Sequence, residues 1–243
     1  MITKYHAKYF AHELTKKCSS DSIQKLMVSL ADAQVDLNPH QVDAALFAFR
    51  SPFSKGAILA DEVGLGKTIE AGIVLSQKWA EGKRKILIIV PSSLRKQWMQ
   101  ELAEKFFLPS IIIETPSFNK FTKEGIANPF DVKENIVICS YHFARNKEEY
   151  VHMVNWDIVV IDEAHRLRNV YRTDNKIAKT IKASIESVPN KILLTATPLQ
   201  NSLMELYGLA SFIDEHIFGD IKSFKEQFIN ISEESIYKDL RER

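Results

Sequence analysis

Residues 58–72 read ILADEVGLGKTIEAG: an apolar run, a loop with two glycines and the start of a helical pattern. Gly66, Lys67 and Thr68 fit the end of the phosphate-binding pattern G-x-x-x-x-G-K-[ST]. In that pattern backbone N–H groups surround a phosphate, the lysine reaches the outer phosphates and the hydroxyl binds Mg²⁺. The first position departs from the pattern because Asp61 replaces glycine, although Gly64 gives the loop a second flexible residue.

Two other interpretations of this loop need to be considered. A dinucleotide-binding fingerprint, G-x-G-x-x-G from Gly64, fails because Ile69 occupies its sixth position. An ordinary glycine turn between a strand and a helix, with Lys67 on the surface, stays open. A second motif with a metal-binding carboxylate is needed to decide between this turn and a phosphate site.

The rest of the chain repeats the same alternation of apolar run and helical segment. Short, unbroken, β-branched runs occupy residues 55–61, 85–91, 111–115, 135–141, 157–163 and 191–197. Such runs are typical of strands buried on both faces of a parallel sheet. Four-residue steps, as from Leu94 to Trp98 and Leu102, indicate helices between them. We therefore predict an α/β domain with a doubly wound, mostly parallel sheet that binds ligands at the carboxyl ends of its strands.

The composition limits the class of protein. The 243 residues are 45% hydrophobic with a net charge of +1, which favours a real core and gives no overall nucleic-acid signature. Cys18 and Cys139 have no disulfide or metal spacing, and we expect Cys139 to be a small buried hydrophobe. No apolar run is long enough for a membrane span, so we expect a soluble, cytoplasmic protein with no membrane partner.

An acidic pair follows the apolar run at residues 157–163, in the sequence DEAH from Asp162 to His165. Because the carboxyl ends of parallel strands share one edge of a sheet, we expect this pair beside the phosphate loop. Asp162 suits Mg²⁺ binding, and Glu163 suits orientation and deprotonation of an attacking water. The alternative is a solvated acidic turn that caps the next helix.

Three segments occur in a fixed order: GLGKT, DEAH and TATPLQNSLMELY, residues 195–207. Together they resemble the first RecA-like lobe of a superfamily 2 helicase-like ATPase. TATPLQN is similar to the Swi/Snf family, and DEVGLGKTIEAG with DEAHRLRN most resembles its bacterial RapA-like (HepA) branch. The resemblance covers residues 37–218, and aspartate is usual in this family where Asp61 stands. It implies a RecA-like P-loop NTPase fold and a helicase-like hydrolase that uses ATP and Mg²⁺ to move along duplex DNA.

The resemblance also implies the residues of the ATP site. Lys67, Asp162 and Glu163 would be catalytic, and Thr68 and Asp162 would bind the metal. Gln41, in LNPHQ, would read adenine, as its primary amide can bond both N6 and N7, or it is an ordinary first-turn helix residue. The full ATP-binding set is Gln41, Asp61, Glu62, Val63, Gly64, Leu65, Gly66, Lys67, Thr68 and Ile69.

Coupling and nucleic-acid contacts follow from the same resemblance. His165, Thr195 and Thr197 would couple ATP to a second lobe, although the threonines also suit helix capping. Ser92, Ser93 and Ser140 would contact the nucleic-acid backbone, although Ser93 also suits an N-cap. Arg166 and Arg168 follow the DEAH residues, and such a basic pair on a turn is more often solvated than bound.

We expect three segments in the chain. Residues 1–36 form a helical extension, residues 37–218 the ATP-binding lobe and residues 219–243 the start of a helical connection. The tail lacks the arginine cluster of a second RecA-like lobe, so we expect that lobe in the rest of the same protein and weak activity without it. Alternatives are an RNA-directed DEAH-type motor, which TATPLQN disfavours, and a nucleotide-gated module that docks on a machine such as RNA polymerase.

Overall fold

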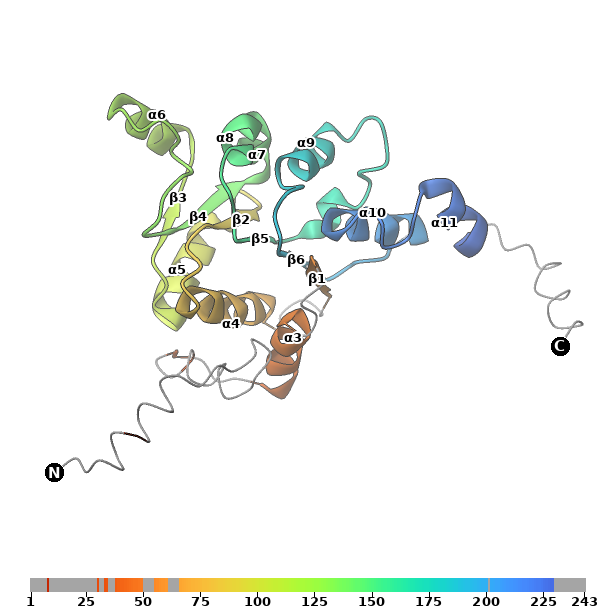
Figure 1. The fold of residues 1–243 in the computed structure, drawn as a ribbon, viewed down its shortest axis with the longest axis horizontal. Helices are drawn as coiled ribbons and strands as arrows, with labels where there is room; N and C mark the ends of the chain where they lie inside the picture. Colours follow the sequence, from red (N-terminus) through yellow and green to blue (C-terminus); the bar gives the residue numbers. More distant parts are fainter. Residues whose placement is uncertain are drawn as a thin grey trace, which may run out of the picture.

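The computed structural model describes residues 8, 30, 33–34, 38–49, 55–60, 66–200 and 202–229 (Figure 1). Most of the predicted N-terminal extension lies outside the described residues, as does the end of the predicted C-terminal connection. Five residues of the predicted phosphate loop also lie outside them: Asp61, Glu62, Val63, Gly64 and Leu65.

The described strands form one six-stranded sheet in the order β1-β6-β5-β2-β4-β3, and all of its pairings are parallel. The strands are β1 (Gly56–Leu59), β2 (Ile86–Val90), β3 (Ser110–Ile112), β4 (Ile136–Ser140), β5 (Ile158–Ile161) and β6 (Lys191–Leu194). The predicted α/β class and parallel sheet are confirmed. Five strands lie inside the predicted runs, and β3 begins one residue early at Ser110.

Helices cover both faces of the sheet (Figure 1). One face packs against α3 (Pro39–Phe49), α4 (Lys67–Ala80) and α5 (Arg95–Phe106). The other packs against α6 (Thr115–Lys123), α7 (Tyr141–Asn146), α8 (Glu148–His152), the 3₁₀ helix η1 (Ala164–Leu167), α9 (Lys176–Ser184) and α10 (Leu203–Ile213). A last helix, α11 (Ile221–Phe228), packs on α10 through Phe224, whose ring centroid lies 4.9 Å from that of Tyr207.

The central strands alternate between the two layers. Leu87 and Ile89 of β2 join the cluster beneath α6–α10, whereas Ile86 and Ile88 join the cluster beneath α3–α5. All four side chains are fully buried, which contributes about 1.5–3 kcal/mol each. Burial on both faces explains why these strands read as unbroken apolar runs.

Cys139 lies on β4 and is fully buried, as predicted for a small hydrophobe. Burial raises the pKa of its thiol to about 12, with a smaller opposing effect from the charge of Arg95. Native Cys139 is therefore an inert packing residue.

Two helical glycines allow close packing between elements. A Cβ on Gly72 of α4 would lie 2.2 Å from the ring of Phe106, at the end of α5. A Cβ on Gly208 of α10 would lie 1.8 Å from the carbonyl oxygen of Arg168, just after η1. The first contact is with a side chain, but the second is with backbone, so α10 is seated directly on the turn that follows the acidic pair.

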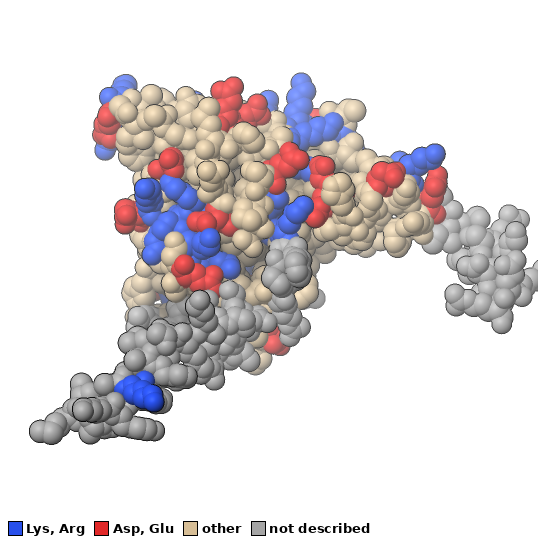
Figure 2. Space-filling model, viewed as in Figure 1, with Lys and Arg blue, Asp and Glu red and all other residues tan. Residues whose placement is uncertain are grey.

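The surface carries mixed charge. Acidic and basic side chains are interspersed over the face shown in Figure 2, in keeping with the net charge of +1. Within the part of the chain that the structure describes, no helix combines the length and apolarity needed to cross a membrane.

Candidate functional site

Three predicted motifs meet at the carboxyl edge of the sheet. Gly66 and the start of α4 follow β1, Thr195 follows β6 and Asp162 follows β5. Because β6 lies between β1 and β5, the three strand ends are neighbours. The backbone N–H of Thr195 donates to the carbonyl of Leu59, with 3.1 Å between nitrogen and oxygen.

The end of the phosphate loop has the backbone that its glycine requires. Gly66 is the N-cap of the 14-residue helix α4 and has φ 93° and ψ 37°, in the left-handed region. A Cβ there would lie 2.4 Å from Nε2 of Gln41. Gly66 has no side chain with which to cap the helix, so the positive end of the α4 dipole faces the loop. Such an end suits a phosphate group.

Gln41 lies against Gly66, the last residue of the predicted loop before α4. Its side chain is buried, and its Oε1 accepts a hydrogen bond from the backbone N–H of Asn38 at 3.2 Å. Helix α3 begins at Pro39, two residues before Gln41. The glutamine therefore joins the start of α3 to Gly66.

Asp162 is buried and held by two donors. Its Oδ2 accepts from the indole Nε1 of Trp98 at 2.8 Å, and its Oδ1 accepts from the backbone N–H of Glu163 at 2.8 Å. Burial is the largest effect on the Asp162 carboxyl and raises its pKa. The hydrogen bonds from the Trp98 indole and the Glu163 backbone lower this pKa. The charge of Glu163 raises it and the charge of Lys67 lowers it, both by less. The charge of Lys67, at the start of α4, is thus among the charges that act on the pKa of this carboxyl.

Glu163 occupies a strained backbone position. Its φ of 54° and ψ of 44° are left-handed, which costs a non-glycine residue about 1–3 kcal/mol. Its side chain is 33% exposed, with Oε2 3.1 Å from Nδ1 of His165. The alternative of a solvated capping turn is wrong, because Asp162 is buried and the Glu163 side chain makes no cap to η1.

Tyr141 ties the acidic turn to the start of α7, which follows β4, two strands along the sheet from β5. Its hydroxyl donates to the backbone carbonyl of Asp162 from the start of α7. Burial, followed by the charge of Asp162, raises the pKa of Tyr141 well above its ordinary value, so the phenol stays protonated as a donor. Sequence reasoning assigned no role to Tyr141 or to the indole of Trp98.

The two predicted coupling threonines differ in exposure. Thr195 is fully buried, and its Oγ1 accepts from the backbone N–H of the exposed Thr197 at 3.2 Å. The N-cap of α10 is instead Ser202, whose Oγ accepts from Met204 N at 3.2 Å. The capping interpretation of these threonines is therefore wrong for α10.

The three predicted nucleic-acid contacts line one cavity of about 380 Å³. Ser92 and Ser93 are exposed, whereas Ser140 is buried and caps α7 by accepting from Phe143 N at 3.3 Å. Ser93 caps nothing, because the N-cap of α5 is Leu94. Exposed Arg166 lines the same cavity and adds a positive charge that sequence reasoning did not use.

Arg168 departs from the sequence expectation. Its side chain is 16% exposed and its Nε lies 3.4 Å from Oε1 of Glu205, so it is not a solvated residue. Arg166, by contrast, is exposed as predicted.

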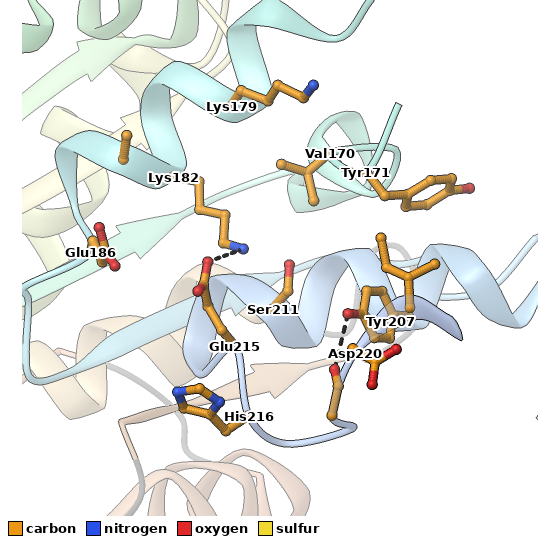
Figure 3. A pocket seen from close by; sticks show the side chains of 13 residues that line it. Val170, Tyr171, Lys179, Lys182, Glu186, Tyr207, Ser211, Glu215, His216 and Asp220 are labelled. Carbon is orange, nitrogen blue, oxygen red and sulfur yellow. Dashed lines mark hydrogen bonds and ion pairs between the residues drawn. The ribbon is translucent and has the colours of Figure 1, made fainter. Parts of the chain in front are cut away.

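A larger cavity lies away from these motifs. It measures about 580 Å³ and is formed by α9, α10 and the loop before α11 (Figure 3). Its lining shares no residue with the predicted site. Inside it, Lys182 pairs with Glu215 at 2.7 Å, and the Tyr207 hydroxyl donates to the carbonyl of Gly219 at 3.0 Å. We therefore locate the site by its chemistry at the sheet edge rather than by cavity size.

Metal binding at the sheet edge would rest on few protein ligands. No cluster of three or more His, Cys, Asp or Glu side chains suited to a metal occurs in the described ranges. Mg²⁺ commonly uses one or two carboxylates with waters and substrate phosphates. Asp162, with Thr68 in the first turn of α4, matches that kind of site.

Two comparisons with known proteins agree with this arrangement. A family model described as SNF2-related domain matches residues 8–242. Among solved structures, the chain is similar to the Sulfolobus solfataricus SWI2/SNF2 ATPase core in complex with dsDNA, with a TM-score of 0.65 and 24% identity. The match covers 81% of this chain and 39% of that chain. The likeness shows the fold, and the predicted RecA-like architecture is confirmed.

Proposed function

The chain belongs to the SNF2-related domain family, and from this premise we propose that it is the ATP-binding lobe of a DNA-dependent Swi/Snf-type motor. One observation carries the proposal: Gly66 with Lys67, Thr195 and Asp162 follow the three neighbouring strands β1, β6 and β5 at one sheet edge. The lobe corresponds to residues 37–218, with residues 1–36 and 219–243 as flanking helical segments. The stretches DEVGLGKTIEAG and DEAHRLRN favour the RapA-like branch, and cysteine usage favours the cytoplasm.

The residues at the edge fit Mg·ATP. The left-handed Gly66 lets the Gln41 amide approach to a distance that a Cβ would prevent, and the α4 N-terminus favours an anion. Asp162 is held by two donors that favour its ionised form, which is the form a metal needs. When bound, Mg·ATP supplies the triphosphate to be cleaved and a cation that neutralises its developing charge.

We assign the following roles to the chain's own residues. Lys67 would contact the outer phosphates through its ammonium group. Thr68 and Asp162 would bind Mg²⁺. Gln41 contacts the base, beside Gly66. The remaining positions assigned to ATP binding are residues 61–65, which lie outside the described residues, and Ile69.

Glu163 is the proposed general base. Its backbone is left-handed, its Oε2 lies 3.1 Å from Nδ1 of His165, and a partly exposed carboxylate can accept a proton from a positioned water. His165, Thr195 and Thr197 would couple ATP binding and hydrolysis at this site to a second lobe.

Duplex DNA is the proposed track. The cavity that holds Ser92, Ser93, Ser140 and Arg166 offers hydroxyl donors and one guanidinium, which suit phosphates rather than base edges. The structural neighbour is an ATPase core in complex with dsDNA, which supports the same class of ligand. Contacts of this kind weaken as salt rises.

Full activity would need a second RecA-like lobe with an arginine finger. Such an arginine is worth about 10³–10⁵ in rate in related systems. We therefore expect residues 1–243 alone to bind nucleotide and hydrolyse it slowly. Fast, DNA-stimulated turnover by this chain alone would overturn that part of the proposal.

The test is single-turnover hydrolysis of labelled ATP by the full gene product, with duplex DNA, single-stranded DNA or RNA, in wild type and Glu163→Gln. A matched control is Glu124→Gln, because Glu124 is half-exposed and pairs only loosely with Lys120 at 3.9 Å. We expect duplex DNA to stimulate hydrolysis in wild type and Glu163→Gln to lose hydrolysis. Glu124→Gln should hydrolyse ATP at the wild-type rate. Stimulation by RNA alone would favour an RNA-directed motor. An equal rate with every nucleic acid would favour a nucleotide-gated module that docks on a machine such as RNA polymerase.

A further inference from the structure

Arg168 links two loops that leave neighbouring strands. Its Nη2 donates to Oε1 of Gln200 at 2.6 Å, and its Nε lies 3.4 Å from Oε1 of Glu205. Arg168 is five residues after the end of the acidic pair, and Gln200 is five residues after Thr195. One side chain therefore spans from the loop after β5 to the loop after β6.

Glu205 closes the link from the other side. Its Oε2 accepts from the backbone N–H of Gln200 at 2.8 Å, and its side chain is only 5% exposed. Arg168 and Glu205 thus hold both the side chain and the backbone of Gln200. A lysine cannot reproduce this, because only the guanidinium presents several donors in a fixed planar arrangement.

Backbone packing fixes the same junction. Gly208 lies one turn after Glu205 on α10, and its Cα faces the carbonyl oxygen of Arg168 so closely that a Cβ would lie 1.8 Å away. Helix α10 therefore cannot shift toward or across the turn without moving Arg168. Since buried ion pairs add little net stability compared with apolar packing, stability alone does not account for the buried Glu205.

We propose that Arg168 and Glu205 are positioning residues that lock the loop at residues 195–200 to the acidic turn at residues 162–165. Nucleotide binding then changes the conformational flexibility of both loops together. The inference rests on the proposed function, because it needs a nucleotide at the sheet edge. Neither residue touches the reacting atoms.

The test is hydrogen–deuterium exchange of residues 195–200 with and without Mg·ADP, in wild type, Arg168→Met and Arg168→Lys. Nucleotide affinity is measured in parallel with a fluorescent ADP analogue. We expect nucleotide to slow exchange in wild type, and Arg168→Met to reduce this protection about 2- to 30-fold. The affinity should change much less than the protection, because Arg168 lies outside the nucleotide site.

Lys182→Met is the matched control. It removes the 2.7 Å ion pair with Glu215, which also joins α9 to the end of α10 but lies away from Gln200 (Figure 3). This variant should keep full protection at residues 195–200. An equal loss in Lys182→Met would show a general stability effect and overturn the inference.

Arg168→Lys keeps the inference testable if Arg168→Met does not fold. It retains a cation for Glu205 but lacks the planar fork, so we expect a folded protein with partly reduced protection. A folded Arg168→Lys with full protection would overturn the inference while leaving the proposed function intact. Failure of the wild type to bind Mg·ADP would instead overturn the proposed function.

Discussion

Gly208→Ala tests the contact between α10 and the turn after the acidic pair. The new Cβ would lie 1.8 Å from the carbonyl oxygen of Arg168, whereas carbon–oxygen contacts normally lie at about 3.3–3.6 Å. Helix α10 must therefore withdraw by about 1.5 Å. Overpacking of this kind costs about 3 kcal/mol at the upper end of its usual range. The better helix propensity of alanine offsets about 1 kcal/mol, which leaves a net loss of about 2 kcal/mol.

Thermal unfolding followed by circular dichroism measures this loss. For a chain of this size, about 2 kcal/mol corresponds to a fall in Tm of roughly 4–8 °C. Gly72→Ala is the matched comparison, because its Cβ would meet the outer ring atoms of Phe106 at 2.2 Å, and a ring can rotate away where backbone cannot. A Tm for Gly208→Ala equal to wild type, or above that of Gly72→Ala, would refute the reasoning.

Three further outcomes are expected. Trp98→Phe removes the 2.8 Å bond to Asp162 and should lower the free energy of unfolding in urea by about 1.5–3 kcal/mol, an effect that should shrink in an Asp162→Asn background. Because burial raises the pKa of Asp162 above its ordinary 3.8, the folded protein binds that proton more tightly than the unfolded chain. The contribution of protonated Asp162 to the free energy of unfolding is therefore lost as pH rises from 3.8 through the folded pKa. Asp162→Asn should flatten the plot of unfolding free energy against pH in that range. An unchanged plot would contradict this prediction. Arg166→Gln should weaken duplex DNA binding and reduce the slope of log affinity against log salt by about 1, whereas Ser92→Ala should weaken binding with the slope unchanged.

The strands and the edge that gathers the motifs were predictable from sequence. Unbroken β-branched runs have no other common explanation when they alternate with helical segments. Parallel strands then bring every strand end to one edge, which is why Asp162 and Gly66 could be placed together. The exact strand limits were less accessible, because polar residues such as Ser110 pair in the sheet as readily as they enter a loop.

The contacts that hold the site were not predictable. Trp98 shows the spacing of a core residue on a helix, and nothing in that spacing reveals a bond to Asp162, 64 residues away. Arg168 follows a charged turn, so a solvated side chain was the reasonable expectation. Its side chain is instead largely shielded from solvent, because Gly208 brings α10 against the turn and Glu205 supplies an opposite charge. Partners of this kind are fixed by packing between distant elements, which a single sequence does not show.

The edge position of β1 has a consequence for how the protein is made. Among the described strands β1 pairs only with β6, and Lys191 comes 132 residues after Leu59. At about 5–20 residues per second, the ribosome needs roughly 7–26 s to reach β6 after β1. During that interval β1 has no strand to pair with, and its apolar side chains have only the neighbouring helices for cover. The segment that begins the phosphate site is thus synthesised well before the strand that fixes β1 in the sheet.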